Sequence, residues 1–415
     1  MRIEDATAAD GGQTLADIGG RRSVRLLAAA RAVSFSGSFA ARIALIYVIY
    51  DRTGSSAWVS AVLVADVGVL GVLGPISGWI GDHWGRRRVM IVSEVAAGVV
   101  FASLIFANAP WLLVAGSLIA TIANAPFLPT STAALPNLVT DDDLRWANSM
   151  QALSNNAGLV VGPMVGGWLL AAGGIHLVFV VNAVSFVASA FVIAQVRGRF
   201  EVARNASDER VGGLRAGYQV IARSRVILTV TAALALAHFT FGLAMVADPA
   251  LAKHFNAGPF GYAVLYTGWG AVALVGAWFA GRAADRAQVP YRVVIGLGTI
   301  AFACVAIAVL PWFWGIVAVG SLGGIGSGAL FPLTTGLIQE HSADSVRARV
   351  FGAIDTVDKS IFATGMIVGA PLVSALGAQG SYGVTAALLS VATVIMCGLP
   401  AAVRRAERPI QAETS

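Results

Sequence analysis

The sequence at residues 78–88 reads Gly78-Trp79-Ile80-Gly81-Asp82-His83-Trp84-Gly85-Arg86-Arg87-Arg88. Apolar runs of roughly 57–81 and 88–108 flank it, and each is long enough to cross a bilayer, which takes ~20 residues. Basic residues resist translocation, so the arginines place this hairpin on the cytoplasmic side. The stretch therefore indicates a charged cytoplasmic turn between two membrane-spanning helices.

Asp82 closes the first of these helices. A helix C-terminus carries partial negative charge, so an acid there is unfavourable unless a positive group lies nearby. Arg86 and Arg87 are close enough in the sequence to supply that group, and so is the N-terminus of another helix. Gly78 and Gly85 permit close backbone approach and a tight turn. The spacing thus indicates a compact turn with a compensated acid.

This pattern resembles the loop between helices two and three of the major facilitator superfamily, Gly-x-x-x-Asp-x-x-Gly-Arg-Arg/Lys. The basic residue that usually follows the acid is His83 here. A generic cytoplasmic loop would explain the arginines but not the Gly–Asp–Gly spacing. The resemblance implies an all-α membrane protein with twelve transmembrane helices in two six-helix lobes, and a gate latched by Asp82.

The composition is that of a polytopic membrane protein. Of the 415 residues, 57% are hydrophobic and 12% are charged, against about 25% charged in soluble proteins. The net charge of +6 does not indicate a nucleic-acid-binding surface, because most basic residues lie in the tails and in alternate loops. This alternation predicts an even number of spans with both termini in the cytoplasm. We expect membrane lipid and a small molecule as partners, and no nucleic acid.

Twelve apolar stretches are long enough to span the membrane. They lie at roughly 26–50, 57–81, 88–108, 110–132, 148–172, 176–196, 226–250, 260–284, 291–310, 313–338, 349–376 and 380–402. The longest and most charged connection divides them equally. The predicted parts are a cytoplasmic N-terminal tail (1–25), a first lobe (26–196), a cytoplasmic linker (197–225), a second lobe (226–403) and a cytoplasmic C-terminal tail (404–415). We expect the polar residues 1–20 to be disordered.

The two halves of the chain repeat at an offset of 203 residues. The matching pairs are Gly78 with Gly281, Asp82 with Asp285, Pro129 with Pro332, Gly162 with Gly365, Gly166 with Gly369 and Gly174 with Gly377. The second copy of the hairpin keeps the Gly–Asp start but lacks the Gly-Arg-Arg end. Parallel repeats of this kind are the arrangement of the superfamily. The sequence therefore predicts duplicated lobes whose gating loops differ.

The fifth predicted span contains Gly158-Leu159-Val160-Val161-Gly162-Pro163-Met164-Val165-Gly166-Gly167. Glycines at this spacing form a groove, and Pro163 removes a backbone donor and bends the helix, so it can pack closely on a neighbour and pivot. The run resembles the signature of drug/proton antiporters of the superfamily, although Ser149 replaces its upstream glycine. The alternative is the generic packing of small residues between membrane helices.

A wider resemblance covers most of the chain. It rests on Tyr50–Ser55 after the first span, on Leu135–Val139, Asp141–Leu144 and Ala147–Ser149 before the fifth, and on Arg347–Phe351 at the start of the eleventh. These segments are similar to bacterial exporters that include macrolide-efflux and enterobactin-exporter proteins. The resemblance implies a monomeric transporter, not an enzyme, in the bacterial cytoplasmic membrane. It would export a lipophilic or siderophore-like molecule, with the proton gradient as driving force and no cofactor.

Charged residues within spans are costly and mark pairing or function. Arg42 lies about eight residues before the outer end of the first span and Asp66 about nine after the outer start of the second, so both lie roughly 12–14 Å deep. We expect them to interact, as a static ion pair or as a proton site. The exporter branch usually carries an acid near Ser38, which is absent here. Asp66 is therefore the better candidate for proton carrier.

Other charges lie in the third and eleventh spans. We expect Glu94 to pair with the arginines of the hairpin more than to couple protons. Glu94 nevertheless joins Asp355, Asp358 and Lys359 as a further candidate for proton coupling. Asp355 and Lys359 are four residues apart and can pair along one helix face. Asp358 then remains, and it would face the second helix or water near the cytoplasmic gate.

Aromatic and small polar residues on spans one, four, seven and ten would line a central cavity. The candidates are Phe35, Tyr47, Asn124, Phe127, His238, Phe241, Phe331 and Thr334, although most could equally be packing residues. Such an apolar, aromatic cavity suits amphipathic ligands. His238 could relay protons, but a lone buried histidine is more often simply hydrogen-bonded. We expect Asp248, which precedes a proline, to end its helix.

These observations predict a secondary transporter that works by alternating access and exports its substrate in exchange for protons. The sequence contains no Gly-x-x-x-x-Gly-Lys-Ser/Thr loop, which argues against ATP-driven transport by this chain alone. The alternatives are a proton-coupled or facilitated importer of a metabolite with the same fold, and a transport-inactive sensor or assembly protein of similar shape.

Overall fold

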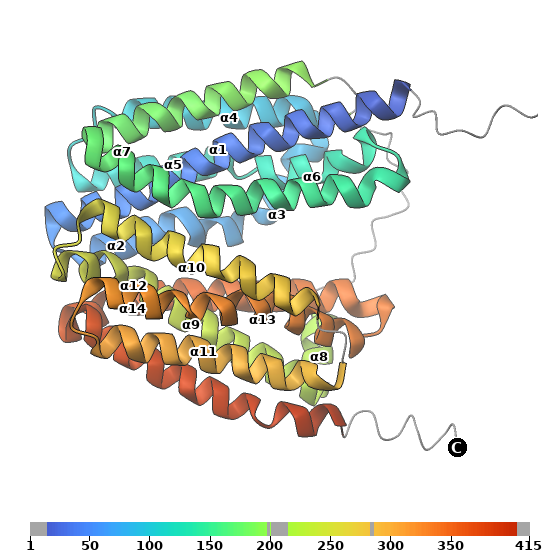
Figure 1. Cartoon of the computed structure of the whole chain (residues 1–415). Helices are drawn as coiled ribbons and strands as arrows, with labels where there is room; N and C mark the ends of the chain where they lie inside the picture. The colour runs from blue at the N-terminus through green and yellow to red at the C-terminus, as the bar shows by residue number, and fades with distance from the viewer. Residues whose placement is uncertain (1–14, 197–199, 201–214, 283–285, 405–415) are drawn as a thin grey trace, which may run out of the picture.

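The computed structural model describes residues 15–196, 200, 215–282 and 286–404. Within these ranges every regular element is a helix, and the helices form two stacked groups (Figure 1). The first group contains α1 (Leu15–Thr53), α2 (Ser56–Leu63), η1 (Val64–Gly68), α3 (Val69–His83), α4 (Arg86–Leu104), α5 (Pro110–Asn124), α6 (Phe127–Leu138), η2 (Asp141–Asp143) and α7 (Leu144–Gln195). The second contains α8 (Arg215–Arg223), α9 (Arg225–His254), α10 (Gly258–Gly281), η3 (Arg286–Gln288), α11 (Val289–Val309), α12 (Phe313–Ser321), α13 (Gly323–Glu340) and α14 (Asp344–Met396).

Helices α7 and α14 are each a pair of antiparallel limbs. They contain 52 and 53 residues, or about 80 Å of helix, more than twice the ~30 Å thickness of the hydrocarbon core. Each reverses at one glycine with φ of +70° and an extended ψ, Gly174 in α7 and Gly377 in α14. Only glycine adopts this conformation without strain. The two reversals are 203 residues apart, so the repeat seen in the sequence recurs in the backbone.

The described residues cross the membrane twelve times. Eight helical segments are long and apolar enough to span it, and the two-limbed α7 and α14 supply two crossings each. The remaining two crossings are α4 and the composite of α2, η1 and α3. The predicted all-helical architecture and number of spans are therefore confirmed.

Three local expectations need correction or lie outside the described residues. Helix α1 begins at Leu15, so residues 15–20 are helical and not disordered. Helix α9 continues through Asp248 and Pro249 to His254, because proline disturbs only its local hydrogen bonding. Part of the linker forms α8, whereas the rest of the linker and most of both tails lie outside the described part of the chain.

Glycines bring the helices of each half into backbone contact. A Cβ at Gly162 of α7 would lie 2.8 Å from the Ser36 oxygen of α1, and one at Gly365 of α14 would lie 2.1 Å from the Phe239 oxygen of α9. Both members of the second pair follow those of the first by 203 residues. Gly166 likewise packs on Ala40. The fifth span therefore packs on the first as its glycine pattern predicts.

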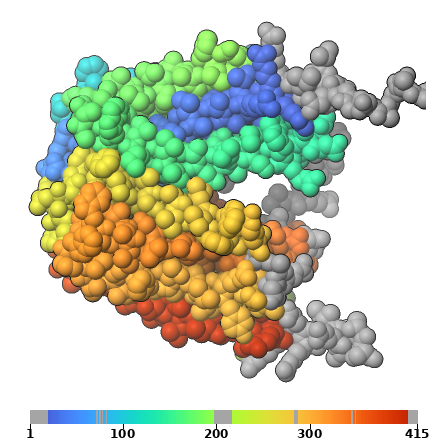
Figure 2. Space-filling model, viewed as in Figure 1, coloured from blue at the N-terminus to red at the C-terminus, as the bar shows by residue number. Residues whose placement is uncertain are grey.

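The two groups touch at one end of the molecule and separate at the other. Ser60 Oγ donates to the Met366 oxygen (2.6 Å), and a Cβ at Gly167 would meet Ala263 Cβ at 2.4 Å. Lys253 pairs with Asp51 at 3.1 Å nearby. We call this the closed end. At the opposite, open end, where α1 begins and α7 ends, Figure 2 shows a hollow between the groups.

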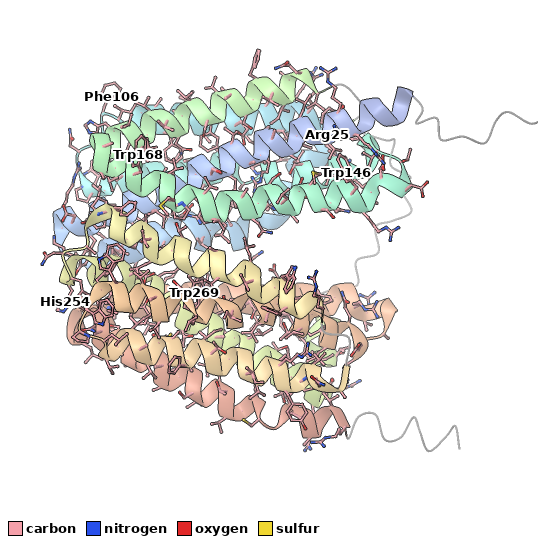
Figure 3. The ribbon with its side chains drawn as sticks, viewed as in Figure 1. Arg25, Phe106, Trp146, Trp168, His254 and Trp269 are labelled. Atoms are coloured by element: carbon pink, nitrogen blue, oxygen red, sulfur yellow. The ribbon has the colours of Figure 1, made fainter. Side chains whose placement is uncertain are left out.

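Exposed aromatic side chains gather near both ends of the helices. Phe106 and Trp168 are exposed at the closed end (Figure 3), and Trp79 and Trp84 flank the hairpin at the open end. Amphipathic aromatic rings favour the two interfaces of a bilayer. This distribution fits a protein whose helix axes run across the membrane.

The glycine contacts generate a prediction for stability. Gly365→Ala should destabilise the protein by about 1–3 kcal/mol, because the new methyl group collides with main chain rather than with a movable side chain. Gly383→Ala is the matched control, since a Cβ there meets nothing within 4 Å. Thermal unfolding of both variants in detergent tests this. Equal midpoints for the two variants would contradict the close contact.

Candidate functional site

The hairpin at the open end is tied to neighbouring helices. Gly85 turns the chain between α3 and α4 with φ of +81°. Arg86 Nη1 donates to the Ala133 oxygen at 2.6 Å, and Arg87 donates to the Ala194 oxygen. Ala194 lies in the last turn of α7, where a helix carries partial negative charge, whereas Ala133 lies in the middle of α6. Arg87 therefore compensates the end of α7, and Arg86 ties the hairpin to α6.

The predicted gate remains partly untested. The side chain of Asp82 and the whole of Asp285 lie outside what the structure describes. Gly81 lets α3 approach α6, because a Cβ there would lie 2.4 Å from Thr130 Oγ1. Gly281 ends α10 in open space. The latch role of this loop stays a prediction.

A second charged cluster at the open end joins α1 to the start of α7. Arg21 donates to both carboxylate oxygens of Asp143, at 2.6 and 2.8 Å. This hydrogen bonding and the positive charge of Arg21 hold the pKa of Asp143 below its usual value. The guanidinium groups of Arg21 and Arg25 both lie 5.8 Å from the centre of the Trp146 ring (Figure 3). Sequence reasoning missed this cluster.

Glu94 lies fully buried in the first group of helices. Its Oε1 accepts hydrogen bonds from Ser34 Oγ (3.0 Å) and, more weakly, from Asn124 Nδ2 (3.4 Å). The Arg31 guanidinium is near enough to attract it. The expected pairing of Glu94 with the hairpin arginines is therefore wrong. The face of α4 that carries Glu94 packs toward α1, so the carboxylate points into the helix bundle and not toward the hairpin.

Arg31 is a buried charge near Glu94 that sequence reasoning passed over. It lies in the first span and is almost fully buried. Its Nε donates to Asn155 Oδ1 at 3.0 Å, and its guanidinium lies over the rings of Phe35 (4.3 Å) and Phe127 (5.3 Å). Phe127 is fully buried and so packs rather than lines a cavity. The sequence did offer a signal for Arg31, because a charged residue inside an apolar run is unusual.

Arg42 and Asp66 form the interaction that their depths predict. Arg42 Nε pairs with Asp66 Oδ2, and Thr121 Oγ1 donates to Asp66 Oδ1 at 3.2 Å. Both side chains of the pair are 18% exposed. Asp66 lies in η1, a π-helical segment, and such segments occur frequently at functional sites. The contact is confirmed, while a proton-carrying role for Asp66 stays a prediction.

The second group has its own acid, paired across two helices. Asp358 Oδ1 of α14 lies 3.5 Å from His238 Nδ1 of α9, so Asp358 faces α9 and not the second helix. One turn farther along each helix, the rings of Phe241 and Phe362 stack with centroids 5.7 Å apart. The two helices thus carry a polar pair beside an aromatic pair. His238, which the sequence analysis treated as a lone histidine, therefore has Asp358 as a partner.

The other predicted residues divide between exposed and packed positions. Lys359 Nζ bonds to Asp355 Oδ2 at 2.7 Å, as their spacing predicts, and both side chains are largely exposed. Phe331 is 78% exposed, whereas Thr334 is buried and bonds to its own helix, so Thr334 is no cavity residue. Tyr47 packs near Tyr262 at the closed end, with ring centroids 5.9 Å apart.

Asp248 is a partly buried acid near the closed end, and sequence reasoning did not identify its partners. Asp248 accepts a hydrogen bond from the hydroxyl of Tyr382, and the Tyr266 hydroxyl lies close by. The acid therefore has polar partners inside the membrane, which explains why α9 continues past it. The Asp-Pro pair by itself suggested a helix end. The partners of Asp248 could not be found in the nearby sequence, because they come from α10 and α14.

The buried charges of Arg31 and Glu94 generate a prediction. Glu94→Ala should cost about 1–3 kcal/mol, because it leaves the buried Ser34 hydroxyl without its acceptor and removes the negative charge that attracts Arg31. Arg31→Met combined with Glu94→Leu should cost less than the sum of the single changes. A double-mutant cycle on unfolding free energy in detergent measures the coupling. Additive effects would show that the two charges do not depend on each other.

Comparisons with known proteins agree with this geometry. The model of the Major Facilitator Superfamily matches residues 27–356 and 230–414. The chain is 27% identical to the MFS-type transporter YfiS of Bacillus subtilis (strain 168), over 79% of this chain and 80% of that protein. It is 25% identical to the multidrug efflux pump Tap of Mycobacterium tuberculosis (strain H37Rv), over 90% of each.

A solved structure shares the fold. The bacterial homologue of the human lysosomal transporter Spinster, inward-facing and unoccupied, superposes with a TM-score of 0.75 at 12% identity, over 94% of this chain and 98% of that one. Proteins of this kind are membrane transporters and not enzymes. The family match covers nearly all of the spans described above, and the chain belongs to the Major Facilitator Superfamily.

Proposed function

We propose that this protein exports a lipophilic or siderophore-like small molecule in exchange for protons. The observation that carries the proposal is the Arg42–Asp66 ion pair, which joins α1 to η1 inside the membrane and is partly exposed. A partly exposed carboxylate can exchange protons with water. The negative charge of Asp66 is held by Arg42 and by the Thr121 hydroxyl, so protonation would release both partners.

A coupling cycle follows from this pair. With the closed end opened, a proton from outside would neutralise Asp66 and break its attraction to Arg42. The freed arginine would then reorganise the site and favour release of substrate outward. With the closed end re-formed, the acid would lose its proton toward the cytoplasm and pair again. In this cycle, an intact Arg42–Asp66 pair together with contacts at the closed end is the arrangement expected of the last stage.

The direction of transport rests on orientation and on relatives. If both termini lie in the cytoplasm, as the basic residues predict, the open end faces the cytoplasm, where an exporter loads its substrate. The relative Tap is described as a multidrug efflux pump. The glycine-rich limb of α7 resembles an antiporter signature. Exposed aromatic rings such as Phe241 and Phe331 suit a lipophilic substrate better than a charged one.

The moving parts would be the two lobes, 26–196 and 226–403, which rock about the substrate within one monomer of the bacterial cytoplasmic membrane. The hairpin that contains Asp82 and Arg86 would latch the open end when it shuts. The linker and tails would lie in the cytoplasm. Import of a metabolite by the same fold is the rival, and the direction of uphill transport in oriented vesicles separates the two.

The proton role of Asp66 generates a prediction. Asp66→Asn should abolish uphill efflux of a fluorescent lipophilic solute from proteoliposomes under an imposed pH gradient, while equilibrium binding of that solute remains. Asp142→Asn is the control, because Asp142 is an exposed acid in a loop helix. Normal uphill efflux by the Asp66 variant would rule out the role.

Alternating access generates a second prediction at the closed end. Asp51 and Lys253 lie 3.1 Å apart across the two groups. In a background without Cys304 and Cys397, cysteines at these two positions should be joined by a bifunctional thiol cross-linker with a reducible spacer that replaces the reach of the lysine side chain, and the link should stop transport. Reduction of the spacer should restore transport. Full transport by the cross-linked protein would show that the closed end need not open.

A further inference from the structure

Titratable side chains from four segments of the second group meet a little below the closed end. We call them the tyrosine cluster, and its members are Asp248 of α9, Tyr262 and Tyr266 of α10, Cys304 of α11 and Tyr382 of the second limb of α14. Each lies four to eight residues from the closed-end terminus of its helix or limb, or about 6–12 Å of helix. Segments that are distant in the sequence therefore place these side chains at one depth.

The acid of the tyrosine cluster has hydroxyl groups as neighbours. The Tyr382 hydroxyl donates to Asp248 Oδ1, and the Tyr266 hydroxyl lies close to the carboxylate. Within the described ranges, no lysine, arginine or histidine lies at ion-pair distance from Asp248, and Lys253 farther along α9 is paired with Asp51 instead. Asp248 is partly exposed, as a group that exchanges protons requires. The tyrosine cluster therefore offers this acid hydrogen bonds but no opposite charge.

Two hydroxyls of the tyrosine cluster lack a well-formed hydrogen bond. Tyr262 is fully buried and Tyr266 is half-buried, and the hydroxyl oxygen of each is enclosed without a partner among the described residues. Their rings meet edge to face with centroids 5.4 Å apart, and Tyr266 lies between Tyr262 and Asp248. The positive charge of Arg42 is near enough to act on Tyr262 but is paired with Asp66. Because a hydroxyl can both accept and donate a proton, the two tyrosines can pass one to the acid.

Tyr262 lies where the two groups of helices touch. Its ring centroid is 5.9 Å from that of Tyr47 of α1, and the next residue, Ala263, packs against Gly167 of α7. Figure 1 shows α10 beside the first group along this contact. Contact between the groups thus encloses Tyr262, and their separation would uncover it. Water would then reach Tyr262 first and Asp248 behind it.

The first half of the chain is apolar at every matching position. The residues 203 positions before those of the tyrosine cluster are Leu45, Val59, Leu63, Phe101 and Phe179. All five are buried, and the rings of Phe101 and Phe179 pack with centroids 6.0 Å apart. The duplicated fold therefore fills this site without an acid or a hydroxyl. The tyrosine cluster is a property of the second half alone, and the needs of packing do not explain it.

We propose that Asp248 is a second proton-binding acid of this transporter, and that its uptake of a proton from outside favours contact between the two groups at the closed end. With the groups apart, water solvates the ionised carboxylate and delivers a proton through Tyr262 and Tyr266, which leaves a neutral carboxyl group. Contact between the groups withdraws that water, and an ionised Asp248 without a cation opposes it. The inference rests on the alternating access proposed above, and it adds an acid of the second half to Asp66 of the first.

Distances between spin labels on the whole protein in lipid nanodiscs test this role. In a background without Cys304 and Cys397, cysteines at Phe106 and Trp312 would carry the labels, because both residues are exposed at the closed end, one in each group. Double electron–electron resonance then gives the ratio of separated to closed molecules. Raising the pH ionises Asp248, so this ratio should rise by up to about tenfold per pH unit over the range in which the acid titrates. A ratio that does not change with pH would overturn the proposal.

Variants of the tyrosine cluster identify the acid responsible. Asp248→Asn resembles the neutral acid, so it should remain mostly closed and lose the rise with pH. Asp248→Leu combined with Tyr382→Phe installs the residues that the first half carries at these positions, and it should unfold near the parent temperature and also lose the rise. This second variant keeps the test open if Asp248→Asn does not fold. An undiminished rise in either variant would overturn the proposal.

Asp66→Asn distinguishes this inference from the transport proposal. The rise with pH should survive in it, because Asp66 has its own arginine and lies outside the tyrosine cluster. Loss of the rise in Asp66→Asn, together with its retention in Asp248→Asn, would overturn the role of Asp248 and leave that of Asp66 standing. A single distance at every pH in all of these proteins would contradict alternating access and would overturn both proposals.

Discussion

Contact between helix backbones holds each half of this protein together. Hydrocarbon offers no partner for a backbone N–H or C=O group, so every span must satisfy its own hydrogen bonds as a helix. The hydrophobic effect adds little between helices already surrounded by lipid, and close packing must supply the attraction. Gly162 against Ser36, and Gly365 against Phe239, bring the axes close enough for that packing. The same contact used twice explains why the repeat is clearest at its glycines.

Charge within this scaffold is arranged by the same need for partners. Glu94 is fully buried, accepts hydrogen bonds from a hydroxyl and an amide, and feels the charge of Arg31, which suits a structural carboxylate. Asp66 has one arginine and one threonine and is partly exposed, so its environment can change with its surroundings. The difference in exposure, more than the presence of an acid, distinguishes a structural carboxylate from a candidate coupling carboxylate.

The closed and open ends differ in what holds them. At the closed end, small residues such as Gly167 and Ala263 bring the two groups into van der Waals contact, supported by few polar links. At the open end, the arginines of the hairpin bond to main-chain oxygens of α6 and α7 within their own half. Each half therefore remains intact whichever end is apart. Such independence is the physical requirement for two bodies that rock against each other.

The sequence by itself carries hydropathy, charge and glycine spacing, which are properties of the chain in one dimension. These properties determined the number of spans, the duplication at 203 residues and the common depth of Arg42 and Asp66. They did not determine which way each helix faces. That rotation depends on packing between distant segments, and it decided that Glu94 meets α1, that Asp358 meets His238 and that Asp248 meets Tyr382.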